Sequence, residues 1–270
     1  MHSIAIHLGP VTIYWYGIMA ALGFLAAVSL LMLNRKTADI DAEQVTDVAM
    51  VCMISGIVGA RIFYVVQFWN LYKDNPFNII RIDQGGLVFF GGFLCAIAML
   101  IFYCWKKRLN ILKILDVFGP SLAIGHFFGR IGCFMNGCCY GKPSELPWSV
   151  QFPAGSPPAV AFPSDPLHPE ACISQHLHPV QIYESVFNLI LAAVLCHMLR
   201  KLKPGQTAAV YLVCYGLGRF TIESMRGDNL RFVLDKFTIS QSIGLMVAAV
   251  GILLLTYTLK NNLGRKHKNA

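Results

Sequence analysis

Long apolar runs separated by short polar connections dominate the chain. Seven runs are about 20 residues long, the length that a helix needs to cross the hydrocarbon core of a bilayer. They lie near residues 12–33, 45–66, 86–104, 112–129, 180–199, 206–224 and 238–259. The pattern predicts an all-α polytopic membrane protein with seven transmembrane helices. Because we find no internal repeat and no second soluble region, we expect a single transmembrane domain over residues 1–270.

The composition agrees with a membrane location. Hydrophobic residues make up 56% of the chain and charged residues 13%, whereas soluble proteins carry about 25% charged residues. No small-residue cleavage site follows the first run, so we expect it to remain as a helix and not to be removed as a signal peptide.

The positions of Lys and Arg predict the orientation in the membrane. The formal net charge is +8, and most basic residues lie in alternate connections and in a tail at 260–270. Positively charged loops stay in the cytoplasm. We therefore expect the N-terminus outside and the C-terminus in the cytoplasm, with the basic tail near anionic lipid headgroups. This distribution gives no reason to expect nucleic acid as a partner.

The longest connection, at about 130–178, is rich in proline and glycine. Proline is incompatible with a helix interior, so we expect an external loop or a small cap here. Connections longer than about 12 to 15 residues are usually functional or disordered. Polar motifs on both sides favour function, although disorder of the middle, 154–176, is an equal alternative.

Three arginines interrupt or border the apolar runs: Arg61, Arg130 and Arg219. An ionisable side chain inside a membrane costs about 2.5 to 3.5 kcal/mol on insertion scales, so such groups usually face the bundle interior and mark function. Each of these arginines lies toward the outer end of its run. Guanidinium groups match phosphate oxygens bidentately, so we expect an anionic phospholipid headgroup as the ligand.

A purely structural role is the alternative for each arginine. Arg219 has a visible partner, because Glu223 lies four residues further along the same helical face. For Arg61, snorkelling or pairing explains the sequence nearly as well as ligand binding does. Arg130 has no acidic neighbour in the sequence and lies among glycines, which permit a close approach of a ligand. A functional role is therefore favoured for Arg130.

Three further polar stretches border the outer ends of the runs. The aromatics at 14–16 suit either an interfacial belt or a site. Glycine pairs at 85–86 and 91–92 predict an unwound entry to the third helix or close packing. The stretch 178–184 opens the fifth helix, and its Glu184 is expected to pair with an arginine and not to act as a base.

These motifs follow one another in a fixed order along nearly the whole chain. They are Trp15-Tyr16-Gly17, Gly59-Ala60-Arg61, the glycine pairs at 85–92, Gly129-Arg130-Ile131-Gly132 with Asn136-Gly137 and Tyr140-Gly141, His178-Pro179 with Gln181 and Glu184, and Tyr215-Gly216 with Arg219, Glu223 and Arg226. In this order the chain resembles the prolipoprotein diacylglyceryl transferase family, whose members are seven-helix bacterial membrane enzymes. Each motif alone is weak evidence, and their order makes the resemblance specific.

The resemblance implies an enzyme of the bacterial cytoplasmic (inner) membrane. It would transfer the diacylglyceryl group of phosphatidylglycerol to the lipobox cysteine of preprolipoprotein signal peptides. The product would be a thioether, and glycerol 1-phosphate would leave. We expect neither a cofactor nor a metal ion.

The resemblance also assigns roles to residues. Arg130 and Arg219 match the essential arginines of the family, which implies phosphate binding and stabilisation of the leaving group. Glu184 and Glu223 would orient these arginines. The expected substrate-binding residues are Arg130, Tyr16, Asn136, Gly141, Glu184, Glu223 and Arg61.

The chain departs from the family pattern at three positions, which leaves the general base open. Phe90 stands where many members have a histidine, Cys133 where the signature often has asparagine, and Cys138 where a carboxylate is common. A thiol has a pKa of about 8.5, so arginines nearby could raise its ionised fraction without a dedicated base. His126, one turn before Arg130, is the candidate replacement, with a packed histidine as the alternative.

Two other functions have some support in the sequence. Phe90 is compatible with a phospholipid-binding or transport paralogue that has lost the chemistry. Cys133, Cys138 and Cys139 are compatible with a membrane thiol oxidoreductase, although adjacent cysteines can hardly form a disulfide without strain. The spacing of these cysteines from His126 or His178 resembles no closed zinc pattern. Neither an oxidoreductase nor a metal site explains the three arginines.

Overall fold

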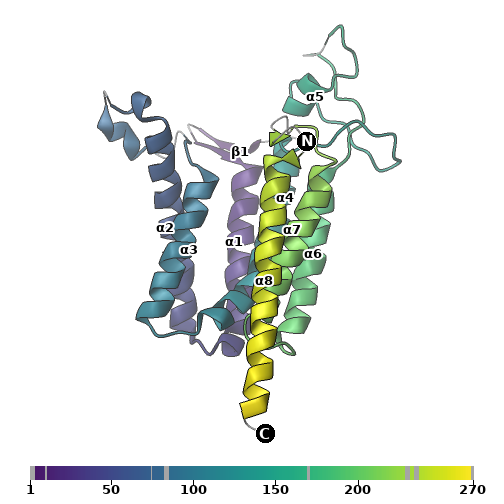
Figure 1. Ribbon diagram of the computed structural model, residues 1–270. Helices are drawn as coiled ribbons and strands as arrows, with labels where there is room; N and C mark the ends of the chain where they lie inside the picture. Colours follow the sequence, from purple (N-terminus) through teal and green to yellow (C-terminus); the bar gives the residue numbers. More distant parts are fainter. Residues whose placement is uncertain are drawn as a thin grey trace. The chain divides into compact units, whose positions relative to one another are not determined.

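The computed structural model describes residues 4–9, 11–73, 75–81, 85–168, 171–228, 232–233 and 237–268 (Figure 1). The chain divides into two compact units, Met32–Ile114 and the pair of segments Met1–Leu31 and Leu115–Ala270. Apart from isolated bridges, the strands of the described part form two short antiparallel pairs. They are β1 (Ile4–Leu8) with β2 (Val11–Tyr14), and β3 (Phe232–Val233) with β4 (Phe237–Thr238).

Within the described residues, seven helices of at least 18 residues coincide with the seven predicted runs. They are α1 (Trp15–Asn34), α2 (Ala42–Gln67), α3 (Phe89–Lys106), α4 (Ile111–Asn136), α6 (Val180–Leu199), α7 (Gln206–Glu223) and α8 (Ile239–Lys268). The prediction of an all-α fold is thus confirmed.

Five of these helices, α1, α2, α4, α6 and α8, are long and apolar enough to cross a membrane. The apolar helix α3 is at the lower limit of length, and α7 carries the charged Arg219 and Glu223. The chain is therefore a multi-pass membrane protein by the length and composition of its helices. Seven membrane spans and the orientation of the termini stay predictions.

In the unit Met32–Ile114, α2 and α3 pack closely through small residues. A Cβ atom added at Gly92 would lie 2.7 Å from the carbonyl oxygen of Gly56, and one added at Gly59 would overlap Cys95. Small residues of this kind let two backbones approach in a membrane helix pair. Gly85 and Gly86 adopt φ values of +79° and +78° just before α3. The glycine pairs thus provide both the unwound entry and the close packing that the sequence predicted.

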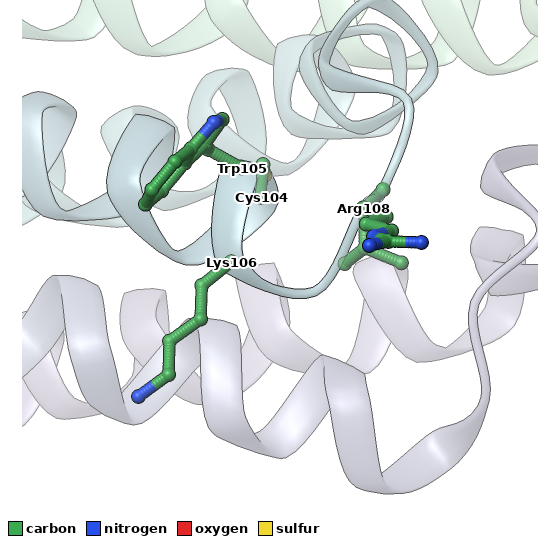
Figure 2. A pocket seen from close by; sticks show the side chains of 5 residues that line it. Cys104, Trp105, Lys106 and Arg108 are labelled. Atoms are coloured by element: carbon green, nitrogen blue, oxygen red, sulfur yellow. The ribbon is translucent and has the colours of Figure 1, made fainter.

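The turn after α3 forms a pocket of about 590 Å³ (Figure 2). Its lining residues are Cys104, Trp105, Lys106, Arg108 and Leu109. The pocket contains none of the site residues that the sequence predicts.

In the other unit, α6, α7 and α8 run side by side (Figure 1). A shared core joins α4, α6 and α7, with Ala123, Leu191 and Leu195 at its centre. The α7–α8 contact is again made by small residues, since a Cβ atom added at Gly216 would lie 2.8 Å from the backbone nitrogen of Ala248. This packing fixes the helix ends that carry the charged residues.

The predicted external loop at 130–178 begins later than expected. Helix α4 continues to Asn136, so the Gly-Arg-Ile-Gly segment is helical and does not belong to the loop. The reason is packing, because Gly132 lies against Tyr16 and Met19 of α1, where a Cβ atom would crowd both side chains. Glycine within a membrane helix is tolerated where a neighbouring helix packs on it.

The described residues between 137 and 179 form a small folded cap. It contains the short helix α5 (Pro157–Ala161) and a core of its own in which Phe152, Ala159 and Leu177 are fully buried. Backbone hydrogen bonds join Phe152 to Ser174 and Phe162 to Gln175. The described residues of 154–176 are thus packed as a cap, which agrees with the functional alternative for this segment.

A buried carboxylate ties the start of α4 to the start of α7. Asp116 is 5% exposed and accepts hydrogen bonds from the N–H groups of Gly205 (2.6 Å) and Ala208 (2.8 Å). Gly205, the N-cap residue of α7, has no side chain to cap the helix itself. Asp116 therefore satisfies free N–H groups at this helix end and places a negative charge at its positive dipole.

We expect Asp116→Ala to destabilise the protein by about 2 to 3 kcal/mol, because two buried N–H groups lose their acceptor. Asp116→Asn keeps one acceptor oxygen and should lose less. The measurement is thermal unfolding in detergent micelles, with Glu145→Ala in the cap as a control at an exposed carboxylate that leaves the midpoint unchanged. An alanine variant as stable as the parent would contradict this role of Asp116.

Candidate functional site

A buried network of charged side chains joins α4, α6 and α7. Arginines and carboxylates alternate in this network, so each buried charge has a partner of opposite sign. Its members are Arg130 on α4, Glu184 on α6, Arg219 and Glu223 on α7, and Arg226 and Asp228 after α7. The structure thus brings together two of the three arginines and both glutamates that the sequence predicted.

Glu184 is the centre of the network. One of its oxygens, Oε1, lies 3.0 Å from Nη2 of Arg130, and the other, Oε2, lies 3.0 Å from Nη1 of Arg219. The Glu184 side chain is 4% exposed, against 12% for each arginine. A single buried carboxylate therefore holds two guanidinium groups that belong to different helices, as the prediction of pairing for Glu184 required.

Glu223 forms the second branching point. Its Oε2 lies 2.8 Å from Nη2 of Arg219 and 3.3 Å from Nη1 of Arg226, and its side chain is fully buried. The hydroxyl of Thr238 donates a hydrogen bond of 3.3 Å to the other oxygen. The predicted pairing of Arg219 with Glu223 on one helical face is confirmed.

Arg226 and Asp228 were not singled out by reasoning from residue types. Arg226 donates from Nε and Nη2 to the two carboxylate oxygens of Asp228, each at 2.9 Å. The sequence feature that could have indicated this pair is the position of Arg226 three residues after Glu223. Burial lowers the pKa of Arg226, but its hydrogen bond to Asp228 and the negative charges nearby outweigh burial and raise the pKa above its ordinary value.

His126 is also part of the network. Its Nε2 accepts a hydrogen bond of 3.0 Å from Nε of Arg130 and lies 3.4 Å from Oε1 of Glu184. Because the arginine nitrogen can only donate, Nε2 of the histidine must supply its lone pair to this bond. His126 therefore orients Arg130, and its Nε2 is not available as a base in this arrangement.

The guanidinium group of Arg130 has one open side. Nε bonds to His126 and Nη2 to Glu184, whereas Nη1 makes no hydrogen bond to any residue that the structure describes. A buried arginine with two fixed nitrogens and one open nitrogen presents preoriented donors to an anion. This arrangement is suited to holding a phosphate oxygen.

The remaining predicted residues of this unit lie at the same end of α4. Tyr16 is the second residue of α1, is 49% exposed, and packs against Gly132. Asn136 is the last residue of α4. Gly141 forms an antiparallel bridge with Arg226 and has no room for a side chain, because a Cβ atom would overlap the backbone of His178. The bridge at Gly141 thus fixes the segment that carries Arg226.

Arg61 lies in the unit Met32–Ile114 and is 8% exposed. All five of its guanidinium hydrogens are directed to backbone carbonyl oxygens at 2.7 to 3.0 Å. These oxygens belong to Asn78, Ile79, Arg81, Gly85 and Gly86. The side chain also lies beside the rings of Tyr64 and Tyr72. These contacts favour the structural alternative for Arg61, while its expected role in substrate binding stays a prediction.

Three thiols meet at the end of α4. The sulfur atoms of Cys133, Cys138 and Cys139 all lie within 4.8 Å of one another. Hydrogen bonds from Cys133 and then Cys138 lower the pKa of the Cys139 thiol, and the charges of Arg226 and Arg130 lower it further. The sequence analysis considered these cysteines as a redox or metal site, but their spacing alone did not predict that the three side chains would converge.

Comparison with known proteins places nearly the whole chain in one family. The model of a family described as prolipoprotein diacylglyceryl transferase matches residues 3–257. A phosphatidylglycerol–prolipoprotein diacylglyceryl transferase of Clostridium tetani is 37% identical over 253 residues, which cover 93% of this chain and 96% of the relative.

Proteins with the same name from other bacteria are similar too. The relative from Synechococcus elongatus is 33% identical over 267 residues, covering 96% of this chain and 88% of the relative. The one from Pseudoalteromonas translucida is 34% identical over 260 residues, covering 92% and 90%.

We expect Arg61→Lys to loosen the segment around residues 76–88, because an ammonium group has three donors and cannot reach five carbonyl oxygens. Amide hydrogen exchange at 76–81 and 85–88 should become faster. Arg35→Lys is the matched control, since Arg35 donates to the single carbonyl of Met32. Unchanged exchange in the Arg61 variant would contradict the role of these carbonyl contacts.

We expect Glu184→Gln to destabilise the protein by about 3 to 5 kcal/mol, because two buried arginines lose the charge between them. Thermal unfolding in detergent measures the loss. Glu145→Gln makes the same chemical change at an exposed residue of the cap and should have no effect. Equal midpoints for the two variants would show that Glu184 is not the centre of the network.

Proposed function

The chain belongs to the prolipoprotein diacylglyceryl transferase family, and on that premise we propose how its residues transfer the diacylglyceryl group of phosphatidylglycerol to prolipoproteins. The acceptor is the thiol of the lipobox cysteine in the signal peptide. The sulfur attacks the glyceryl carbon that carries the phosphate. A carbon–sulfur bond forms, the carbon–oxygen bond to phosphate breaks, and glycerol 1-phosphate leaves with the bonding electrons.

The observation that carries this proposal is the open side of Arg130. Negative charge grows on the phosphate as the carbon–oxygen bond breaks, and donors already aimed at that charge lower the barrier. His126 and Glu184 fix two of the three guanidinium nitrogens of Arg130, so its Nη1 needs no reorientation when the phosphate arrives. Arg130 therefore binds the phosphate and stabilises the leaving group.

Arg219 supports the same phosphate from the other side of Glu184. Its guanidinium is held by Glu184 and by Glu223, and it is 12% exposed, as Arg130 is. Because both arginines bind one carboxylate, they lie close together. A phosphate that binds to one is therefore also attracted by the positive charge of the other. Tyr16, Asn136 and Gly141 surround this region as contacts to the headgroup or the peptide.

The same proposal covers the membrane arrangement. A helix of 18 residues is about 27 Å long, close to the hydrocarbon thickness of about 30 Å, so α3 and α7 cross the membrane with the other five helices. The N-terminus lies outside, the C-terminus lies in the cytoplasm, and the network faces the outer leaflet of the bacterial cytoplasmic (inner) membrane. Phosphatidylglycerol then enters from the bilayer.

The test is transfer by the purified protein. The protein is incubated in detergent with phosphatidylglycerol and a peptide containing a lipobox, and both the peptide mass and the released glycerol phosphate are measured. We expect a diacylglyceryl mass increase that requires the peptide cysteine. Arg130→Ala should lower the rate by about 10²- to 10³-fold.

The matched control is Arg200→Ala, an exposed arginine at the end of α6 that should leave the rate unchanged. A peptide with serine in place of cysteine should gain no mass. Folded protein that binds phosphatidylglycerol but forms no product would contradict the transferase and would indicate a lipid-binding paralogue.

A further inference from the structure

The end of α4 is built as a turn that gathers thiols. The N–H of Gly137 donates to the carbonyl of Phe134 at 3.2 Å, and the N–H of Cys138 donates to the carbonyl of Cys133 at 3.1 Å. With Gly137 at φ +71°, these bonds form a Schellman motif. This motif returns the chain across the last turn of the helix, so Cys138 lies beside Cys133.

The next residue continues the turn. Cys139 has φ +58°, a left-handed conformation that is uncommon for residues other than glycine. Helix α6 holds the turn in place, because Nε2 of Gln181 donates to the carbonyl of Cys138 at 2.8 Å. The three sulfur atoms therefore lie within 4.8 Å of one another on a fixed backbone, and all three side chains are partly exposed.

This geometry is close to that of a zinc site. Zinc binds thiolates at about 2.3 Å, which places tetrahedral sulfur ligands about 3.8 Å apart. The observed limit of 4.8 Å requires only a small contraction, within reach of side-chain rotation. In the part of the chain that the structure describes, this is the one such group of His, Cys, Asp or Glu ligands, and it has three members. Three protein ligands and an open fourth position are typical of catalytic zinc, whereas structural zinc has four.

The surrounding charge favours a bound zinc thiolate group. Zinc with three thiolates carries a net negative charge, and the positive charges of Arg226 and Arg130 act on Cys139. Cys133 lies three residues after Arg130 on α4, so the thiols and the phosphate-binding arginine share one end of the helix. Arginines beside the cluster offset its charge.

The charged network itself offers no free base for the acceptor thiol. Glu184 and Glu223 are each shared between two arginines, and Nε2 of His126 is bonded to Arg130. Phe90, at the position where the family pattern often has histidine, cannot accept a proton. Besides the electrostatic effect of the arginines on a nearby thiol, a metal that binds thiolate would activate the acceptor without a base.

We propose that Cys133, Cys138 and Cys139 bind a zinc ion whose open fourth position binds the acceptor thiol of the prolipoprotein as a thiolate. The inference rests on the proposed function and extends it. On binding, the peptide thiol releases its proton to water, because a coordinating thiol is deprotonated. The zinc-bound sulfur attacks the glyceryl carbon, the phosphate leaves toward Arg130, and the thioether dissociates from zinc. Zinc keeps its oxidation state throughout.

The first measurement is metal binding by the full-length protein, independent of turnover. Protein purified under reducing conditions with zinc should contain one zinc per chain, with three sulfur ligands at about 2.3 Å by X-ray absorption. Addition of the lipobox peptide should raise the number of sulfur ligands to four, and the serine peptide should not. Absence of bound zinc, or a sulfur number unaffected by the cysteine peptide, would overturn the proposal.

Variants identify the ligands. Serine at Cys133, Cys138 or Cys139 should weaken zinc binding at least about tenfold, since even outer partners of a metal contribute that much. Cys172→Ser, the same change in the cap, should bind zinc as the parent does. Cobalt(II) added to the unmodified protein gives sulfur-to-cobalt absorption if the thiols bind, which keeps the test independent of how the variants fold. Equal zinc affinity in all four variants would overturn the assignment.

The activity measurement separates this inference from the proposed function. Protein stripped of metal by a chelator should lose at least about tenfold in transfer rate and regain it with zinc. Full activity without metal would overturn the zinc site and leave the transferase intact. Protein that contains zinc on its three thiols but forms no product with phosphatidylglycerol would instead overturn the proposed function.

Discussion

The sharing of Glu184 between Arg130 and Arg219 is the interaction on which the site depends. Each ion of such a pair loses several kcal/mol of hydration when it is buried, and only close partners of opposite charge offset that loss. Glu184 is placed by α6, Arg130 by α4 and Arg219 by α7, so the three helices must dock in one register for the charges to meet. The apolar core between these helices sets that register.

The rest of this unit supports the same docking. Close contacts at Gly132 and Gly216 bring α1 against α4 and α7 against α8 without bulky side chains between them. Asp116 ties α4 to the start of α7 at the opposite end of both helices from the network. A helix pair fixed at both ends has little freedom to slide, so the guanidinium of Arg130 keeps its direction without help from a bound lipid.

Contacts between residues close together in the sequence could be predicted from it, whereas contacts between distant residues could not. The hydrophobic runs predicted all seven long helices, and the pairing of Arg219 with Glu223 followed from their spacing on one helix. The partner of Arg130 lies on another helix, so no spacing rule could identify it, and only the resemblance implied that Glu184 orients it. The true end of α4 was missed because packing of Gly132 on α1 overrides the weak helix preference of glycine. The convergence of three thiols depends on the turn at Gly137, whose geometry the spacing of cysteines does not express.

The five backbone carbonyl oxygens that bind Arg61, which we call the carbonyl cage, bear on which side chains this part of the sequence can carry. Every acceptor in the cage is a main-chain oxygen, and every residue type, proline included, carries one. The hydrogen bonds of Arg61 to this segment therefore depend on the path of the backbone and not on the identities of the side chains at 78, 79 and 81. The contacts to Arg61 therefore tolerate a change of side chain at 78 and 79, provided that the glycines at 85 and 86 preserve the left-handed bend. Backbone oxygens can thus hold a buried arginine without fixing the side chains that accompany them.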